Sequence, residues 1–526
     1  MPRDKDVFQQ PSAGTVAHDE PPPGARGAST RTFFGQPVGL STLFFTEMWE
    51  RFSFYGIRPL LILFMTAALA TGGFNFSRET AGAIVGIYSA CVYLSALPGG
   101  WIADRLLGLR KAIWYGAILI AAGHISIALS IVFAHSAFFI GLILIVLGTG
   151  LLKPNISAIV GDLYPEGGAR RDAGFSIFYM GINVGALVAP LVTGYLGEKI
   201  AWHLGFGAAG VGMLIGVFTY WRRADKTLGD VGTAPASNDP AEHRRIKLII
   251  AVSVGIIALL VLLAMTGLMT INPVSIAEKM KYGIAAMAML YFLYVFIAGG
   301  LNTAEKKRVV IIFLLFVFAV IFWSAFEQAP TSLNLFAHDF TDRVVFGWEM
   351  PTLWLQSANS VFVIALAPVF GMIWVALAKR GRAPSSVAKF AWGLFFAGLG
   401  FIVMLVAANV VIKGGGKVLV SPWWLVLSYL FQTFGELSLS PVGLSSMTKL
   451  APLKFKGQMM GVWFMADALG NLIAGLVGGH VDPEKLDQMP ILFRQTSISL
   501  FIAAAVCGLL VFPVRKMMKG VPAADR

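Results

Sequence analysis

The chain has 526 residues, of which 57% are hydrophobic and only 13% are charged, and its formal net charge is +13. Apolar runs of about 20 residues recur along it, which excludes a soluble globular domain and predicts an all-α polytopic membrane protein. A positive balance can indicate nucleic-acid binding, but basic residues in short loops between apolar runs report membrane topology instead. We therefore expect a lipid bilayer as the surroundings and no nucleic acid as a partner.

In chain order, a polar segment rich in Pro, Gly, Ala and Ser comes first and lacks the apolar core of a signal peptide. Six apolar runs follow, then a hydrophilic linker, two runs with almost no interior charge, and six more, which predicts fourteen transmembrane helices. We divide the chain into a disordered N-terminal tail (1–38), a six-helix bundle (39–221), a linker (222–245), two additional helices (246–301), a second six-helix bundle (302–513) and a C-terminal tail (514–526).

The loops on the side of the two termini hold most of the Lys and Arg residues. The positive-inside rule then places both tails and the 222–245 linker in the cytoplasm, and the chain in the inner (plasma) membrane. Weak similarity between the fourth and tenth runs, and between the fifth and eleventh, indicates that the two bundles are repeats. We expect the protein to act as a monomer.

Signals for enzyme chemistry are weak. The GxGxxG pattern at 205–210 lies inside an apolar run with no strand before it, so close helix packing explains it. Cys91 and Cys507 each lie in an apolar run, and we expect no disulfide, metal or cofactor. His124, in mid-span, could relay protons or be a bonded structural histidine. The absence of a P-loop argues against ATP-driven transport, and we expect no enzymatic activity.

The segment 43–59 is organised around charges in an apolar run. On a helix, Glu47, Arg51, Tyr55 and Arg58 share one face, and Glu50 lies beside Arg51. A charge near the bilayer centre costs about 2.5–3.5 kcal/mol, so such groups pair with one another or face a water-filled path. The cluster is therefore either an ion pair that locks helices together or a site for a ligand and protons.

Five motifs carry a family resemblance. The run GxxxDRxxGxRK at 100–111 resembles the loop motif of the major facilitator superfamily. ExxER at 47–51, the run around Asn183 at 175–187, FWSAFEQ at 322–328 and GELSLSP at 435–441 together closely resemble the proton-dependent oligopeptide transporter family. The resemblance covers residues 39–513. It implies a major facilitator fold with two extra helices between the bundles, and import of di- and tripeptides with protons by alternating access.

A peptide is a zwitterion, so its site needs both signs of charge and roomy apolar pockets. Arg51 and Lys153 are candidates for the peptide carboxylate, and Glu436 for the ammonium group. The resemblance gives these positions the same roles. The complete set of predicted substrate-binding residues is Arg51, Tyr55, Tyr93, Lys153, Asn183, Trp323, Asn359, Glu436, Ser440 and Trp463.

For proton coupling, the resemblance indicates Glu47, Glu50, Arg51 and Glu327. It implies that Glu47 and Glu50 pair with Lys153 in some states. It also implies two gating ion pairs, which are Arg58 with Glu327 and Lys153 with Glu436. Protonation and peptide binding would break and remake these pairs.

Other interpretations stay open. Asn183 and Asn359 could bond only to a neighbouring helix backbone, and the aromatic side chains could be core or lipid-facing. The chain could carry another anionic or peptide-like solute, such as nitrate or a peptidomimetic drug, or be a transport-dead sensor or an intramembrane enzyme. Two positions depart from the family pattern. Ser360 stands where proline is usual, and Phe54 replaces a tyrosine common beside Tyr55.

Overall fold

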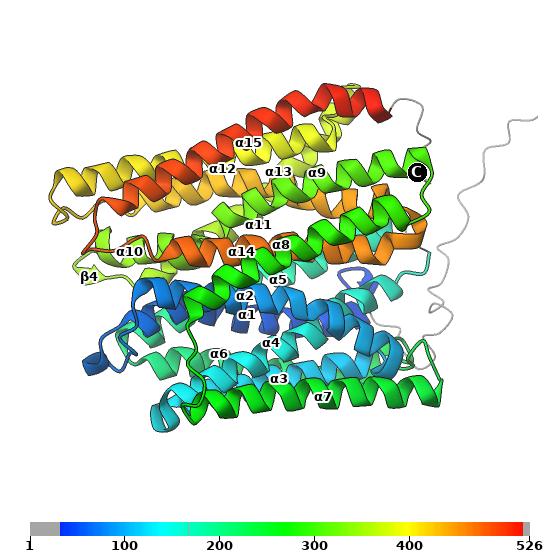
Figure 1. Cartoon of the computed structure of the whole chain (residues 1–526), viewed down its shortest axis with the longest axis horizontal. Helices are drawn as coiled ribbons and strands as arrows, with labels where there is room; N and C mark the ends of the chain where they lie inside the picture. The colour runs from blue at the N-terminus through cyan, green and yellow to red at the C-terminus, as the bar shows by residue number, and fades with distance from the viewer. Residues whose placement is uncertain (1–31, 167, 519–526) are drawn as a thin grey trace, which may run out of the picture.

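The computed structural model describes residues 32–166 and 168–518, and the helices run roughly parallel or antiparallel to one long direction (Figure 1). The chain enters α1 and leaves α15 at the same end of this array, which we call the terminal end; the other is the distal end. The helices within these residues are α1 (Gly39–Thr66), α2 (Arg78–Ile102), α3 (Leu109–Ala128), α4 (Ser130–Asp162), α5 (Gly168–Lys199), α6 (Trp202–Leu228), α7 (Pro240–Met265), α8 (Pro273–Ala298), α9 (Thr303–Phe326), α10 (Asn334–Phe340), α11 (Ser357–Lys379), α12 (Ser386–Lys413), α13 (Trp423–Leu450), α14 (Lys456–Gly478) and α15 (Gln488–Met518).

Twelve spans in the described part of the chain are long and apolar enough to cross a membrane. Helices α1 and α13 are not among the twelve, although each has 28 residues. Both carry polar side chains along their length, with Glu47 and Arg51 in α1 and Glu436 in α13. With them, the long helices of the described chain number the fourteen that the sequence predicts.

The helices form two bundles, α1–α6 and α9 with α11–α15, and the bundles meet where α2 packs on α14 and α5 on α11. The two additional helices lie outside this core: α7 lies at one edge of the array, and α8 crosses over α2 and α14 (Figure 1). The most apolar window of α7 has no buried residue. Its side chains therefore face the surroundings almost completely, as expected for a helix in lipid.

Element boundaries differ from the predicted ones at several points. Helix α6 continues to Leu228 and α7 begins at Pro240, so the non-helical linker is 229–239 rather than 222–245. Pro240 occupies the first helical turn and Asp239 caps it, which explains this start. Residues 32–37 form a small hairpin, and α15 extends into the predicted C-terminal tail. Most of the tails, residues 1–31 and 519–526, lies outside the described residues.

The predicted seventh span is interrupted. Helix α9 ends at Phe326 with Glu327 as its C-cap, and a π-helical turn, Ala329–Leu333, leads into α10. Pro330 in this turn lacks the N–H that a regular α-helix needs. The break places the Glu327 carboxylate at a helix end inside the protein.

Two short hairpins share one turn sequence. Strands β1 (Thr32–Phe33) and β2 (Gln36–Pro37) flank Phe34-Gly35, and β3 (Val344–Val345) and β4 (Trp348–Glu349) flank Phe346-Gly347. All four turn residues have positive φ, between 51° and 78°. Two successive residues of positive φ define the tight turn that suits the strand twist, which explains the glycine in each pair.

Glycines bring α2 and α14 close together at the distal end. A Cβ placed on Gly475 would lie 2.5 Å from the Gly86 Cα and 2.6 Å from the Gly82 carbonyl oxygen. Such a separation leaves no room for a side chain, so the two backbones are in direct contact. The distal halves of the two bundles are therefore closed against each other at this point.

Candidate functional site

The ExxER residues form a buried ion cluster on α1. Glu50 accepts two hydrogen bonds from the Arg51 guanidinium, and Nε of Arg51 lies 3.5 Å from Oε1 of Glu47. All three side chains are at most 2% exposed. Oε2 of Glu47 has no hydrogen-bond partner in the described part of the chain. One guanidinium thus serves two carboxyl groups, and one oxygen of Glu47 is left unused.

Arg58, two turns further along α1, contacts three elements of the structure. Its guanidinium pairs with Glu327 and donates to Oδ1 of Asn471 on α14, and its Nε donates to Oγ of Ser89 on α2 at 3.0 Å. The three partners are at most 7% exposed. Since α9 and α14 belong to the second bundle, Arg58 joins the two bundles through buried polar contacts.

Lys153, on α4, lies near an aromatic ring rather than an acid. Its Nζ lies 4.2 Å from the centroid of the Tyr93 ring. Among the described residues it makes no ion pair within 4.0 Å, so its implied pairs with Glu47, Glu50 and Glu436 are not formed in this arrangement. It does interact electrostatically with Arg51, Asp467, Glu50 and Glu47. Its ammonium group is therefore available to an anion.

Glu436 lies on α13 in the second bundle, and amide and hydroxyl groups surround it. Nδ2 of Asn359 on α11 donates to Oε2 of Glu436 at 3.3 Å and lies 3.0 Å from the Thr433 hydroxyl. No cation lies within 4.0 Å of the Glu436 carboxylate in the part of the chain that the structure describes. Ser440, one turn further along α13, is half-buried. This acid can accept a cationic group.

The Asn183 side chain is bonded to its own helix. Its Nδ2 donates to the carbonyl oxygen of Tyr179 at 2.9 Å. His124 is 1% exposed, and neither of its ring nitrogens has a hydrogen-bond partner among the described residues.

The predicted aromatic residues lie between the bundles. The rings of Trp323 on α9 and Trp463 on α14 meet edge to face, with centroids 6.4 Å apart, and both are buried. Tyr55 interacts electrostatically with Arg51 and Glu436. Tyr179 interacts electrostatically with Glu436 and Tyr55 and is 44% exposed.

Phe54, which departs from the family pattern, packs against the charged residues of α1. Its ring is 1% exposed and lies under two guanidinium groups, 4.8 Å from Arg51 and 5.6 Å from Arg58. It also stacks on Tyr88. A ring beneath two cations stabilises them by cation–π attraction, so this position supports the ion clusters.

Sequence reasoning missed several members of the site. Ser89, Thr433, Asp467 and Asn471 all join the polar contacts around the predicted residues. The last two form an i,i+4 pair inside an apolar run, and that spacing could have been read as a polar helix face. Ser89 and Thr433 carry no such signal, because single hydroxyl residues are common in membrane helices.

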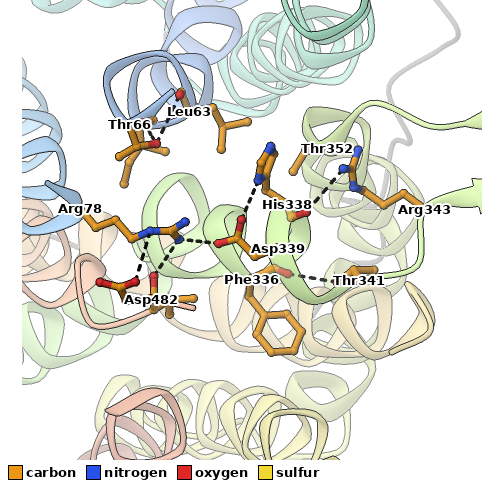
Figure 2. A network of polar contacts seen from close by, with 12 residues as sticks. Leu63, Thr66, Arg78, Phe336, His338, Asp339, Thr341, Arg343, Thr352 and Asp482 are labelled. Carbon is orange, nitrogen blue, oxygen red and sulfur yellow. Dashed lines mark hydrogen bonds and ion pairs between the residues drawn. The ribbon is translucent and has the colours of Figure 1, made fainter. Parts of the chain in front are cut away.

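A second polar network closes the distal end (Figure 2). Arg78, at the start of α2, pairs with Asp339 of α10, donates to the Val481 carbonyl at 2.9 Å and lies 4.0 Å from Asp482. Figure 2 shows Asp339 held between Arg78 and His338, whose Nδ1 is 2.8 Å from the Asp339 carboxylate. Arg78 belongs to the first bundle and its partners to the second, so this network links the bundles.

A further link lies between α5 and the segment before α11. The Glu198 carboxylate accepts from the backbone N–H groups of Thr352 and Leu353 at 2.8 and 3.0 Å. Lys199 pairs with Glu349 of β4 at 2.9 Å. Both links bind the end of α5 to the second bundle.

Two helical bundles joined by buried ion pairs, with charges of both signs between them, are the architecture of a membrane transporter. A protein-family model described as "PTR2: POT family" matches residues 110–489. The chain belongs to the proton-dependent oligopeptide transporter (POT) family.

Curated relatives and solved structures agree with this assignment. The chain is 53% identical over 497 residues to "Peptide transporter YePEPT" of Yersinia enterocolitica, covering 93% of this chain and 96% of the relative. It is 37% identical to a "Di-/tripeptide transporter" of Lactococcus lactis subsp. cremoris, covering 91% and 95%.

Among solved structures, a peptide transporter POT in complex with sulfate superposes with a TM-score of 0.87 at 42% identity, covering 95% of this chain and 100% of the other. A POT family transporter in complex with 5-aminolevulinic acid gives 0.82 at 34% identity, with the same coverage. These matches agree with the predicted major facilitator fold.

Proposed function

We propose that the chain imports di- and tripeptides together with protons across the inner membrane, with the terminal end in the cytoplasm. The observation that carries this proposal is the placement, in opposite bundles, of Lys153 and Glu436, neither of which has an ion-pair partner within 4.0 Å among the described residues. A zwitterion bound between them would place its carboxylate at Lys153 and Arg51 and its ammonium group at Glu436. The relatives named as peptide transporters support this assignment.

Side-chain tolerance would come from the aromatic residues around these charges. Tyr55, Tyr93, Trp323 and Trp463 offer rings rather than directional polar groups, so they can accept side chains of different chemistry. Asn183 and Asn359 would add hydrogen bonds to the peptide termini. Because Asn359 already donates to Glu436, it would orient that carboxylate for the ammonium group.

Alternating access would follow when charged side chains exchange their ion-pair partners. Glu327 would take a proton and release Arg58, which loosens the link between α1 and α9. Glu47 would take a proton at Oε2, which has no partner among the described residues, and Glu50 would hold Arg51 in place. Peptide bound from the distal side at Lys153 and Glu436 would draw the bundles together there and form the distal links, while the terminal side opens to the cytoplasm.

Uptake of labelled dialanine into proteoliposomes with an alkaline interior tests the proposal. The wild type is expected to concentrate dialanine, and Glu47→Gln is expected to keep exchange but lose accumulation. Glu436→Gln removes a charge-assisted contact, which lowers the apparent affinity about 10- to 100-fold. Glu278→Gln, which alters an exposed pair on α8, is the control and should match the wild type. A folded wild type without pH-driven uptake would refute peptide symport.

A second candidate is another solute that carries an amine and a carboxylate. A structurally similar POT transporter is described in complex with 5-aminolevulinic acid, which has both groups. Competition separates the candidates. Excess 5-aminolevulinic acid should reduce dialanine uptake if both share the Lys153 and Glu436 charges, whereas nitrate, which lacks an amine, should not.

A further inference from the structure

Asp467, on α14, is a buried carboxyl group that the mechanism above does not use. Asp467 is 6% exposed. Oδ1 accepts a hydrogen bond of 3.1 Å from Nδ2 of Asn471, and the same amide donates to the Asp467 carbonyl oxygen at 2.9 Å. Within the described chain, no Lys, Arg or His nitrogen lies within 4.0 Å of its carboxylate. Buried charges are normally paired or neutralised by a proton, so this group needs an explanation.

The charged groups around Asp467 come from several elements. Arg58 of α1 and Lys153 of α4 attract its charge, and Glu327 at the end of α9 repels it. The Tyr93 hydroxyl of α2 also interacts with it. Helices α8 and α13, which pack on α14 as well, contribute no charged group to this set among the described residues.

An amide connects Asp467 to the gating ion pair. Asn471 donates to Asp467 with its Nδ2, while its Oδ1 accepts from Arg58, which pairs with Glu327. Asn471 is 2% exposed, so water does not compete for these bonds. Two buried carboxyl groups therefore share one guanidinium, Glu327 by direct contact and Asp467 through the amide. Movement of Arg58 toward one of them changes the surroundings of the other.

We propose that Asp467 is a further proton-binding site of the transport cycle, beside Glu47 and Glu327, and that it is coupled to Glu327 through Asn471 and Arg58. In this step an O–H bond forms on the Asp467 carboxylate with a proton from water on one side of the membrane. The same bond breaks when the proton passes to water on the other side, and no electrons are transferred. The proposal rests on the proposed function and adds that more than a single proton accompanies each peptide.

The neutral isostere separates proton binding from helix bracing. In Asp467→Asn the side-chain oxygen can still accept the hydrogen bond from Asn471, but the group can no longer bind a proton. A purely structural role would survive this change. Asp467→Ser provides a second non-ionisable variant, and Asp225→Asn provides a matched control because the Asp225 side chain is 89% exposed.

The experiment determines the number of protons moved per dialanine in proteoliposomes. A fixed dialanine gradient is imposed, and the pH gradient at which net dialanine movement stops gives this ratio. Counterflow without a gradient confirms that each variant is folded and binds substrate. We expect a wild-type ratio above a single proton, an unchanged ratio in Asp225→Asn, and a lower ratio in whichever Asp467 variant keeps counterflow. Each proton lost lowers steady-state accumulation about tenfold per pH unit of gradient.

Two results would overturn the inference. One is a ratio of a single proton per peptide in the wild type. The other is a ratio in Asp467→Asn or Asp467→Ser that equals the ratio of the wild type. In both cases peptide symport itself would stand. A wild type that moves dialanine without protons would instead refute the proposed function.

Discussion

Arg58 on α1 pairs with Glu327 at the C-cap of α9, and this buried contact ties the first helix of one bundle to the first helix of the other. It lies where α9 breaks before its π-helical turn. The guanidinium has further partners in Asn471 and Ser89, so three other elements contact this one side chain. Removing or neutralising this pair should therefore lower the stability of the fold and weaken the contact between the two bundles.

The first prediction concerns stability. Arg58→Ala leaves Glu327 buried without a cation, and loss of one partner of a buried pair destabilises a protein by about 3–5 kcal/mol. Thermal unfolding in detergent should show a clearly lowered Tm. Arg105→Ala is the control, since Arg105 pairs with Glu242 at 3.0 Å but is half exposed, and its loss should change stability by less than about 1 kcal/mol. Equal Tm shifts in both variants would contradict a structural role for the Arg58 contact.

The distal network gives a second prediction. Asp339→Asn weakens the contact with Arg78, so the distal end should open more often; a weakening of about 1.4 kcal/mol would raise the open-to-closed ratio about tenfold. Spin labels on Thr80→Cys and His480→Cys, measured by pulsed electron resonance, should show a larger population at long distance. Asp482→Asn removes a longer contact of 4.0 Å and should change this population less. The reverse order would refute the assignment of Asp339 as the main partner of Arg78.

The close approach of α2 and α14 gives a third prediction. Gly475→Ala adds a Cβ within 2.6 Å of α2 backbone atoms, so the helices must separate. Overpacking of this kind costs about 1–3 kcal/mol, and the Tm should fall. Gly457→Ala, on the same helix, meets nothing within 4 Å and should leave the Tm unchanged. A neutral Gly475→Ala variant would show that the helices are not in backbone contact.

A fourth prediction concerns Glu349, the acidic residue in strand β4. The hydrogen bond from Lys199 holds the pKa of Glu349 below its ordinary value, with Arg343 also nearby. A lowered pKa in the folded chain means that the ionised carboxylate stabilises the fold above the unfolded-state pKa, and that this stabilisation is lost as pH falls through the folded-state pKa. The Tm difference between wild type and Glu349→Gln should thus shrink on acidification below about pH 4.3.

Solvent exposure of Glu349 limits the size of this stability difference. The Glu349 side chain is 52% exposed, so the difference should stay below about 1 kcal/mol even at neutral pH. A Tm difference that grows on acidification would have the wrong sign and would reject the ion pair as its cause.

Much of the fold was predictable because membrane spans are read from apolar length alone. The boundaries of the helices were less predictable. The linker is shorter than 222–245 because Asp239 and Pro240 start α7 early, and capping of this kind overrides polar composition. The break after Phe326 required attention to Pro330, which the apolar pattern hides.

The site was predictable where charge interrupts an apolar run. The contact between Arg58 and Glu327 was expected from the family resemblance. The contacts of Lys153 with Tyr93, and of Asn183 with its own helix, could not be predicted, because they depend on the arrangement of the bundles in one conformation. Asp467 was missed because a single acid in an apolar run was not weighed against its i,i+4 neighbour Asn471.

Proton entry that accompanies the peptide tests the central claim most directly. Proteoliposomes with a trapped pH-sensitive dye and no imposed gradient receive dialanine on the outside. Symport predicts that the interior acidifies as labelled dialanine enters, and that Glu327→Gln and Glu47→Gln abolish the acidification. Entry of dialanine into wild-type vesicles at constant internal pH would contradict proton coupling.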